Sequence, residues 1–311
     1  MFPTCWCGAA RRATIRYSQA ERARGSSVTY QTIAQIIPRA FTFLFIFYLA
    51  KILGSIEYGK YDYSVSFGYL IGVFFELGGN VILTKYVARG YFSAFKYSLK
   101  FRIVSIILTF SVVFLVLYIF KLHQEILLHI LFAMTGIAFS SLMNLYFAFF
   151  RGVRKMNYEA IVLVIQKIIF ISVCLLLIIN NKSASLALLS FAVSMIISWL
   201  IIQGIFIVKK KQYVEVESNH RIIFKDYFKD IMSLALVEVF SIVYFRVTQI
   251  ILEAYAGYGA VGVYGASYKL VEAFVNIPSI LMIVFFPGFA KLAVDSIPEF
   301  KRQFKRVLFL A

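Results

Sequence analysis

Long apolar runs constrain this chain more than any other feature. A helix of about twenty predominantly apolar residues crosses the hydrocarbon core of a bilayer, and runs of that length follow one another along the sequence. They lie near 33–52, 63–83, 101–120, 127–150, 160–180, 185–208, 231–255 and 260–290. Each run is far too long for a β-strand, and hydrophobic residues make up 61% of the chain. The sequence therefore predicts an all-α, polytopic membrane protein with about eight transmembrane helices.

The distribution of Lys and Arg predicts how these helices are oriented. Counted from the N-terminus, and including Lys51 and Arg102 at the edges of two runs, the segments between the runs carry five, two, five, one, three, one, six, none and five basic residues. Basic residues are enriched in cytoplasmic segments, so the alternation places the N-terminus and every second turn in the cytoplasm. The net charge of +17 is explained by this topology, and no nucleic acid partner is expected. We expect a multi-pass protein of the plasma (inner) membrane with a cytoplasmic N-terminus.

A short glycine-rich pattern occurs twice. The stretches "LGSIEYGKYDYS" (53–64) and "AGYGAVGVYGAS" (256–267) share two Gly, a Tyr and a Ser at a constant offset of 203 residues, because Gly54, Gly59, Tyr61 and Ser64 correspond to Gly257, Gly262, Tyr264 and Ser267. Each copy follows the first run of one half. We interpret the chain as two parallel repeats, each beginning with two helices joined by a glycine-rich outer turn.

The repeat predicts the domain organisation. We expect a basic N-terminal tail at 1–29, a first six-helix bundle at 30–208, a cytoplasmic amphipathic linker at 209–230 and a partial second bundle at 231–311. The second bundle contains helices seven and eight and the start of a ninth helix at Val307–Ala311. It is therefore incomplete, and we interpret the sequence as C-terminally truncated.

Two stretches carry a resemblance to a known family. "IAQIIPRAFTFLFIFYLAKILG", continued by "GSIEYGKYDYSVSFGYLIGVFFELGGN", and the later "RVTQIILEAYAGYGAVGVYGASYKLVEAFVNIPSILMIVFFPGFAKL" resemble the oligosaccharide flippases of the polysaccharide-transporter family. That family belongs to the multidrug/oligosaccharidyl-lipid/polysaccharide exporter superfamily. The resemblance covers roughly residues 30–311 and rests on diffuse glycine and aromatic patterns.

The resemblance implies a function. Two helix bundles would carry a polyprenyl-pyrophosphate-linked oligosaccharide from the inner to the outer leaflet by alternating access, for the biosynthesis of a cell-surface polysaccharide such as lipopolysaccharide or exopolysaccharide. The implied partners are the lipid-linked oligosaccharide, membrane lipids, and the polysaccharide polymerase and chain-length machinery. No cofactor and no enzymatic activity are expected.

Ionisable residues inside the predicted spans are the candidate site residues, because such residues are costly in hydrocarbon and usually face the bundle interior. Arg offers a planar fork to phosphate oxygens and Lys a point charge, so the candidates for substrate binding are Arg39, Arg246, Lys269 and Lys167. The candidates for ion coupling or charge pairs are Glu76, Glu238 and Glu272. Three alternatives stay open: Arg39–Glu76 as a static ion pair, Lys269–Glu272 as another, and Lys167 reaching toward the cytoplasm.

Asn80 and Asn144 are polar without being charged, and they suit either sugar hydroxyls or hydrogen bonds between helices. Cys5 and Cys7 have no second pair of ligands, so no metal site is predicted. The sequence contains no G-x-x-x-x-G-K-[ST] pattern, so direct use of ATP is not expected.

Two other functions remain open at this stage. A multidrug or metabolite exporter of the same superfamily needs a carboxylate in the first half as a Na⁺ or H⁺ site, and Glu76 is the candidate. A polyprenyl-dependent glycosyltransferase or polymerase needs acidic residues in an outer turn, where Glu57 and Asp62 lie. The second copy of this turn lacks both acids, which favours a hinge over an active site.

Overall fold

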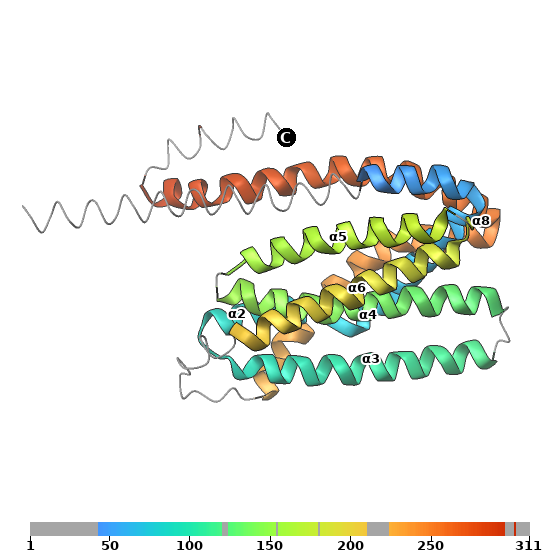
Figure 1. Cartoon of the computed structure of the whole chain (residues 1–311). Helices are drawn as coiled ribbons and strands as arrows, with labels where there is room; N and C mark the ends of the chain where they lie inside the picture. The colour runs from blue at the N-terminus through green and yellow to red at the C-terminus, as the bar shows by residue number, and fades with distance from the viewer. Residues whose placement is uncertain are drawn as a thin grey trace, which may run out of the picture. The chain divides into compact units, whose positions relative to one another are not determined.

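The computed structural model describes residues 43–119, 124–153, 155–179, 181–209, 224–295 and 302. These residues form α-helices joined by short turns, and they contain no strand. After a first helix over 43–76 come α2 (Gly79–Ala88), α3 (Ser93–Ile119), α4 (Gln124–Gly152), α5 (Asn157–Ile178), α6 (Ala184–Lys209) and α8 (Phe224–Asp295) (Figure 1). The predicted all-α fold is confirmed.

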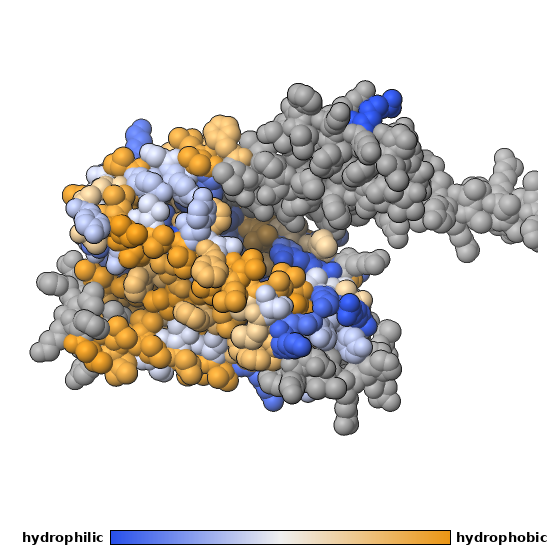
Figure 2. Space-filling model, turned by 180° about the vertical axis from the view of Figure 1, so that it is seen from behind, coloured by the Kyte–Doolittle hydropathy of each residue, from blue (hydrophilic) through white to orange (hydrophobic). Residues whose placement is uncertain are grey.

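Six helical stretches within the described residues are long and apolar enough to cross a membrane: Phe43–Ala88, Ser93–Val116, Ile126–Gly152, Asn157–Ile178, Ala184–Lys209 and Tyr227–Glu272. The first and last of them have 46 residues each, about twice the length that one crossing requires. Side chains on their surfaces are largely apolar, and Figure 2 shows such side chains covering most of the middle of one face. The protein is therefore a multi-pass membrane protein, for which lipid is the solvent of this surface.

The chain divides into two compact units. The larger unit is Phe41–Leu270, in which α4 packs against α2, α3, α5 and α6, and α5 packs against α6. The other unit comprises Met1–Ala40 and Val271–Ala311, and of it the structure describes the helical residues 271–295 and residue 302. The predicted basic tail, Arg39 and the predicted ninth helix lie outside the described residues.

Small and aromatic residues shape the core of the larger unit. Buried small residues follow one another along α6, at Ala184, Ala187, Ser190, Ser194 and Ser198, and let neighbouring helices approach closely. Aromatic rings from α3, α4 and α6 fill the other end of this core, where the ring of Phe206 contacts those of Phe95, Tyr146, Phe149 and Phe150. The core thus holds the larger unit together around α4.

The two copies of the glycine pattern adopt the same backbone conformation. Gly54 has a φ of 76° and Gly257 a φ of 74°, a left-handed conformation that side-chain-bearing residues adopt at a cost. Each glycine interrupts one of the two 46-residue stretches. The predicted ten-residue outer turn at 53–62 is wrong in its length, because helix resumes directly after Gly54. The hinge is a single residue in each copy.

The two hinges also pack against each other reciprocally. A Cβ on Gly59 would clash with the carbonyl oxygen of Tyr258, and a Cβ on Gly262 would clash with the carbonyl oxygen of Ser55. Both pairs are related by the same offset of 203 residues (59 and 262, 55 and 258). This reciprocity is the arrangement that a two-fold axis between two repeats produces.

Two further helix boundaries differ from the predicted ones. The second helix, predicted to continue to residue 83, breaks at Leu77 and Gly78 before α2 begins. The amphipathic part of the predicted linker is the start of α8, since that helix begins at Phe224 and continues into the membrane-spanning residues. Tyr227 and Ile231 are buried, so tertiary packing extends the helix beyond the apolar run.

Candidate functional site

A break in a membrane-spanning helix organises the polar residues of the larger unit. Leu77 and Gly78 have φ values of 45° and 77°, and α2 begins at Gly79 without a side-chain cap of its own. The missing acceptor comes from α8, because the carboxylate of Glu238 accepts a hydrogen bond from the backbone N–H of Gly78. A Cβ on Gly78 would lie only 2.8 Å from the Cβ of Leu234. Glycine is therefore required both by the backbone conformation and by the close approach of α8.

Polar side chains on both sides of this break form one network. Glu76 accepts hydrogen bonds from the side-chain amides of Asn80, at 2.6 Å, and Asn144, at 3.3 Å. Arg102 donates to the amide oxygen of Asn80, at 2.9 Å, and to the carbonyl oxygen of Ser141. The network joins three helices and the end of the first helix, and it satisfies groups that would otherwise be costly in the membrane.

Arg102 is the charged centre of this network. It is 2% exposed, and the carboxylates of Glu76 and Glu238 both act on it electrostatically. Two acidic groups and one basic group therefore share a small region at the helix break. Such clusters inside a membrane span are the usual locations of ion and substrate pathways.

The sequence predictions identified this network only in part. Glu76 and Glu238 were predicted, and the asparagines use their side chains for hydrogen bonds between helices or across the break. Arg102 was missed, because it was assigned to the cytoplasmic segment before the run at 101–120. The helix begins at Ser93, so Arg102 lies about 13 Å along it. The small polar residues and high helix propensity of 93–100 were the available signal for this earlier start.

A second polar site lies where α8 meets the first helix. The guanidinium of Arg246 lies 5.0 Å from the centre of the Tyr69 ring, a distance at which a cation and an aromatic face attract each other. Arg246 also acts electrostatically on Tyr61. Arg246, which precedes the hinge at Gly257, therefore contacts a residue that follows the hinge at Gly54.

A third site brings two predicted lysines together. Lys167 from α5 and Lys269 from α8 are close enough for their charges to repel each other. Nothing in the sequence relates these two positions, since they are joined only by tertiary packing. Glu272 lies in the other compact unit, and its pairing with Lys269 stays a prediction.

The two acidic residues of the first hinge have structural partners. Glu57 binds Lys60 at 2.7 Å and accepts a hydrogen bond from the backbone N–H of Ala184, at 2.9 Å, at the start of α6. That carboxylate thus satisfies a free N–H at a helix N-terminus. Asp62 is 3% exposed and packs against Gly265. Both acids are therefore used in packing the hinge, which does not favour the glycosyltransferase alternative.

Comparison with known proteins places this fold in a family. A family model described as "Polysaccharide biosynthesis protein" matches residues 25–293. The chain belongs to this polysaccharide biosynthesis family. The resemblance seen in the sequence is thereby confirmed. No curated protein matches the chain.

Solved structures add a comparison of folds for this family member. The chain is similar to the inward-facing conformation of a multidrug resistance MATE family transporter of the MOP superfamily, with a TM-score of 0.60 and 15% identity over 86% of this chain. It spans 66% of that structure's length. A MOP superfamily transporter from Pyrococcus furiosus also matches, with a TM-score of 0.44 and 16% identity over 90% of this chain and 72% of that one. The first likeness shows a shared fold.

Proposed function

We propose that this polysaccharide biosynthesis protein flips a polyprenyl-diphosphate-linked oligosaccharide from the inner to the outer leaflet of the plasma membrane by alternating access. The family supports the link to polysaccharide synthesis, and the fold is that of a structure described as a transporter. The observation that carries the proposal is that Lys167, Lys269 and Arg246 all lie on membrane-spanning helices of one compact unit, where the charges of Lys167 and Lys269 act on each other.

These cations suit a diphosphate for a physical reason. Repulsion between Lys167 and Lys269 is stronger in the low dielectric of a protein interior than in water, and an anion bound between them replaces repulsion with attraction. Arg246 lies over the Tyr69 ring, which orients its planar guanidinium while leaving N–H groups for phosphate oxygens. Arg39 is proposed as a further contact and Glu272 as a partner of Lys269.

Flipping of a fluorescent polyprenyl-diphosphate-linked oligosaccharide in proteoliposomes tests this proposal. The variants Arg39→Gln, Lys167→Gln and Arg246→Gln are compared with Lys182→Gln, which removes an exposed charge from the turn before α6. Loss of one phosphate contact worth about 1.4 kcal/mol slows flipping about tenfold, whereas Lys182→Gln leaves the rate unchanged. Wild-type rates in Lys167→Gln and Arg246→Gln, or no flipping by the wild-type protein, would overturn the proposal.

The carboxylates near the helix break favour one second candidate, an ion-coupled exporter. Glu76 and Glu238 act electrostatically on each other and on Arg102, and such a group suits exchange of H⁺ or Na⁺. The structure with the same fold is described as a multidrug resistance transporter. Export of an organic cation that requires a Na⁺ or H⁺ gradient, is abolished by Glu76→Gln and Glu238→Gln, and occurs without any flipping would establish the exporter instead.

A further inference from the structure

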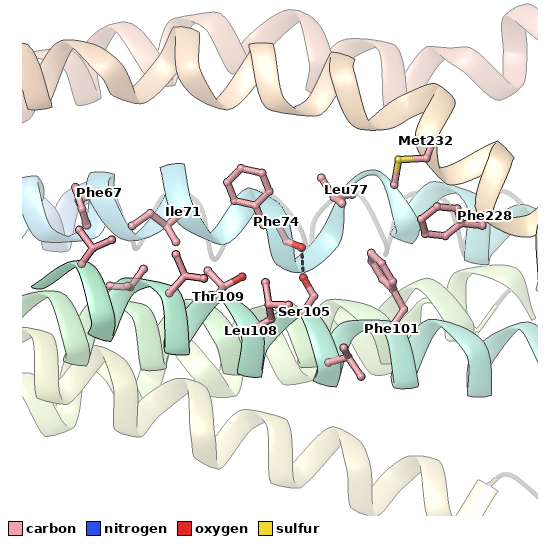
Figure 3. A pocket seen from close by; sticks show the side chains of 14 residues that line it. Phe67, Ile71, Phe74, Leu77, Phe101, Ser105, Leu108, Thr109, Phe228 and Met232 are labelled. Carbon is pink, nitrogen blue, oxygen red and sulfur yellow. Dashed lines mark hydrogen bonds between the residues drawn. The ribbon is translucent and has the colours of Figure 1, made fainter. Parts of the chain in front are cut away.

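An apolar groove runs along α3 on a surface that the site described above does not use. Its volume is about 650 Å³, within the range of ligand-binding pockets in proteins. Figure 3 shows Phe67, Ile71 and Phe74 of the first helix, and Leu77 of the turn after it, beside Phe101, Ser105, Leu108 and Thr109 of α3. Phe228 and Met232 of α8 contribute at the end near Phe101 and Leu77.

The groove offers almost no polar group to a ligand. Apart from Ser105 and Thr109, its fourteen lining residues are apolar, and the Ser105 hydroxyl donates to the carbonyl oxygen of Phe74. The lining residues on α3 run from Phe101 to Val116, a length of about 22 Å along the helix. The groove therefore follows most of the hydrocarbon thickness of about 30 Å, and its shape and chemistry fit an extended hydrocarbon chain.

Positive charge gathers at one end of the groove. Lys96 and Lys100 precede the lining residues Val104 and Leu108 at four-residue intervals on the same exposed face of α3. Lys229 is also exposed and follows Phe228. Within the described part of the chain none of these three lysines forms an ion pair. Their end of α3 is predicted to be cytoplasmic, where the phosphates of inner-leaflet lipids lie.

We propose that this groove binds the polyprenyl chain of the lipid-linked substrate on the inner side, with its diphosphate at Lys96, Lys100 and Lys229 before the diphosphate passes to Lys167, Lys269 and Arg246. The inference rests on the proposed function, and it assigns the lipid part of the substrate to a surface separate from Lys167, Lys269 and Arg246. A diphosphate suits three unpaired lysines better than the single phosphate of an ordinary phospholipid. A single long chain also suits one continuous groove.

A photoreactive polyprenyl diphosphate, with a diazirine in the chain and no sugar, tests this assignment. The probe is irradiated with the purified protein in phosphatidylglycerol-containing vesicles, and labelled residues are identified by mass spectrometry. We expect labels within 101–116 that unlabelled polyprenyl diphosphate removes. Equal removal by added phosphatidylglycerol would show a groove for any membrane lipid and would overturn the proposal, as would labels confined to other helices.

Trp variants inside the groove, compared with Trp variants at exposed positions beside it, distinguish a loss of lipid binding from a loss of folding. Leu108 and Ile107 are 62% and 61% exposed, but only Leu108 lines the groove. Leu108→Trp and Val112→Trp are expected to lower labelling about tenfold, while Ile107→Trp and Leu115→Trp leave it unchanged. Replacing Lys96 and Lys100 by Gln weakens probe binding without moving the labelled residues. Unchanged labelling in both groove-filling variants overturns the proposal.

Flipping measured in the same vesicles separates this inference from the proposed function. If the protein flips the lipid-linked oligosaccharide but the groove is not labelled, the groove assignment fails and the flippase stands. If the groove binds the polyprenyl probe specifically but no oligosaccharide is flipped, the lipid site stands and the proposed transport activity fails.

Discussion

At the scale of single residues, Arg102 shows how a charge within a membrane-spanning helix is accommodated. Its guanidinium is bound by Asn80 and the carbonyl oxygen of Ser141, and it lies in the field of Glu76 and Glu238. Burying a charge costs several kcal/mol unless it is paired and hydrogen-bonded. The network therefore stabilises the helix break.

Replacing Arg102 by Gln is expected to destabilise the protein strongly. The amide oxygen of Asn80 and the carbonyl oxygen of Ser141 would lose their donor, and the half-buried Glu76 and Glu238 would lose a nearby cation. Leaving buried polar groups without a partner costs about 1–3 kcal/mol. Thermal unfolding in detergent measures the change. Lys100→Gln is the matched control, because it removes the same charge two residues away at an exposed position. An equal and small effect of both substitutions would contradict a structural role for Arg102.

At the scale of helices, the apolar runs located the spans but not their ends. The pattern of apolar residues predicted α3 from residue 101, yet the helix begins at Ser93, because Ala94, Phe95 and Ser98 are buried against neighbouring helices. The break at Leu77–Gly78 was also missed, although "LGGN" places two glycines together. Gly78 adopts a left-handed conformation there, and its lack of a side chain leaves room for Leu234 on α8. The sequence held a local signal for both features, but the contacts that use them are distant in sequence.

The repeated glycines, in contrast, were predictable from the sequence. Only the constant offset of 203 residues was needed to pair Gly54 with Gly257, and both adopt the same left-handed conformation.

The sequence predicted which charged residues lie within the spans, but not which of them lie near one another. Charged residues within spans identified Glu76, Glu238, Arg246, Lys167 and Lys269, whereas the approach of Lys167 to Lys269 follows from packing alone.

The crossing of the two hinge helices yields a prediction at this scale. A methyl group at Gly59 or Gly262 would clash with a backbone carbonyl of the other repeat, and backbone gives way less easily than a side chain. Gly59→Ala and Gly262→Ala are each expected to lower the free energy of unfolding by about 1–3 kcal/mol or more. The two losses should be similar, because the two contacts are equivalent. Thermal unfolding in detergent measures both changes.

Gly204 provides the control for these substitutions. It lies exposed on α6, and a Cβ there would meet no atom within 4 Å. Gly204→Ala should therefore be neutral or stabilise the helix by about 0.5–1 kcal/mol. If Gly59→Ala and Gly262→Ala behave like Gly204→Ala, the helices do not cross as closely as the structure shows.

At the scale of the whole molecule, the reciprocal crossing unites the two repeats at their hinges. The contact is reciprocal: the carbonyl group of Tyr258 lies against Gly59, and the carbonyl group of Ser55 lies against Gly262. Ser55 and Tyr258 are equivalent positions of the two repeats, 203 residues apart, and so are Gly59 and Gly262. Transport by alternating access requires the two repeats to move relative to each other. The crossing is therefore the contact at which such motion can be blocked with little change to either repeat.

A disulfide across the crossing tests whether the repeats move there. A Cβ on Gly259 would lie 3.8 Å from Cγ1 of Ile56, so Ile56→Cys with Gly259→Cys approaches the geometry of a disulfide, in a background where Cys5, Cys7 and Cys174 are replaced by Ser. We expect oxidation to abolish transport in proteoliposomes and reduction to restore it. The control pair Gly68→Cys with Ala133→Cys joins the first helix to α4 within one repeat. A Cβ on Gly68 would lie 3.5 Å from the Cβ of Ala133, and oxidation of this pair should leave transport intact. Full transport by the oxidised Ile56–Gly259 pair would show that the crossing stays closed throughout the cycle, and that access to the two sides of the membrane changes by motion of other helices.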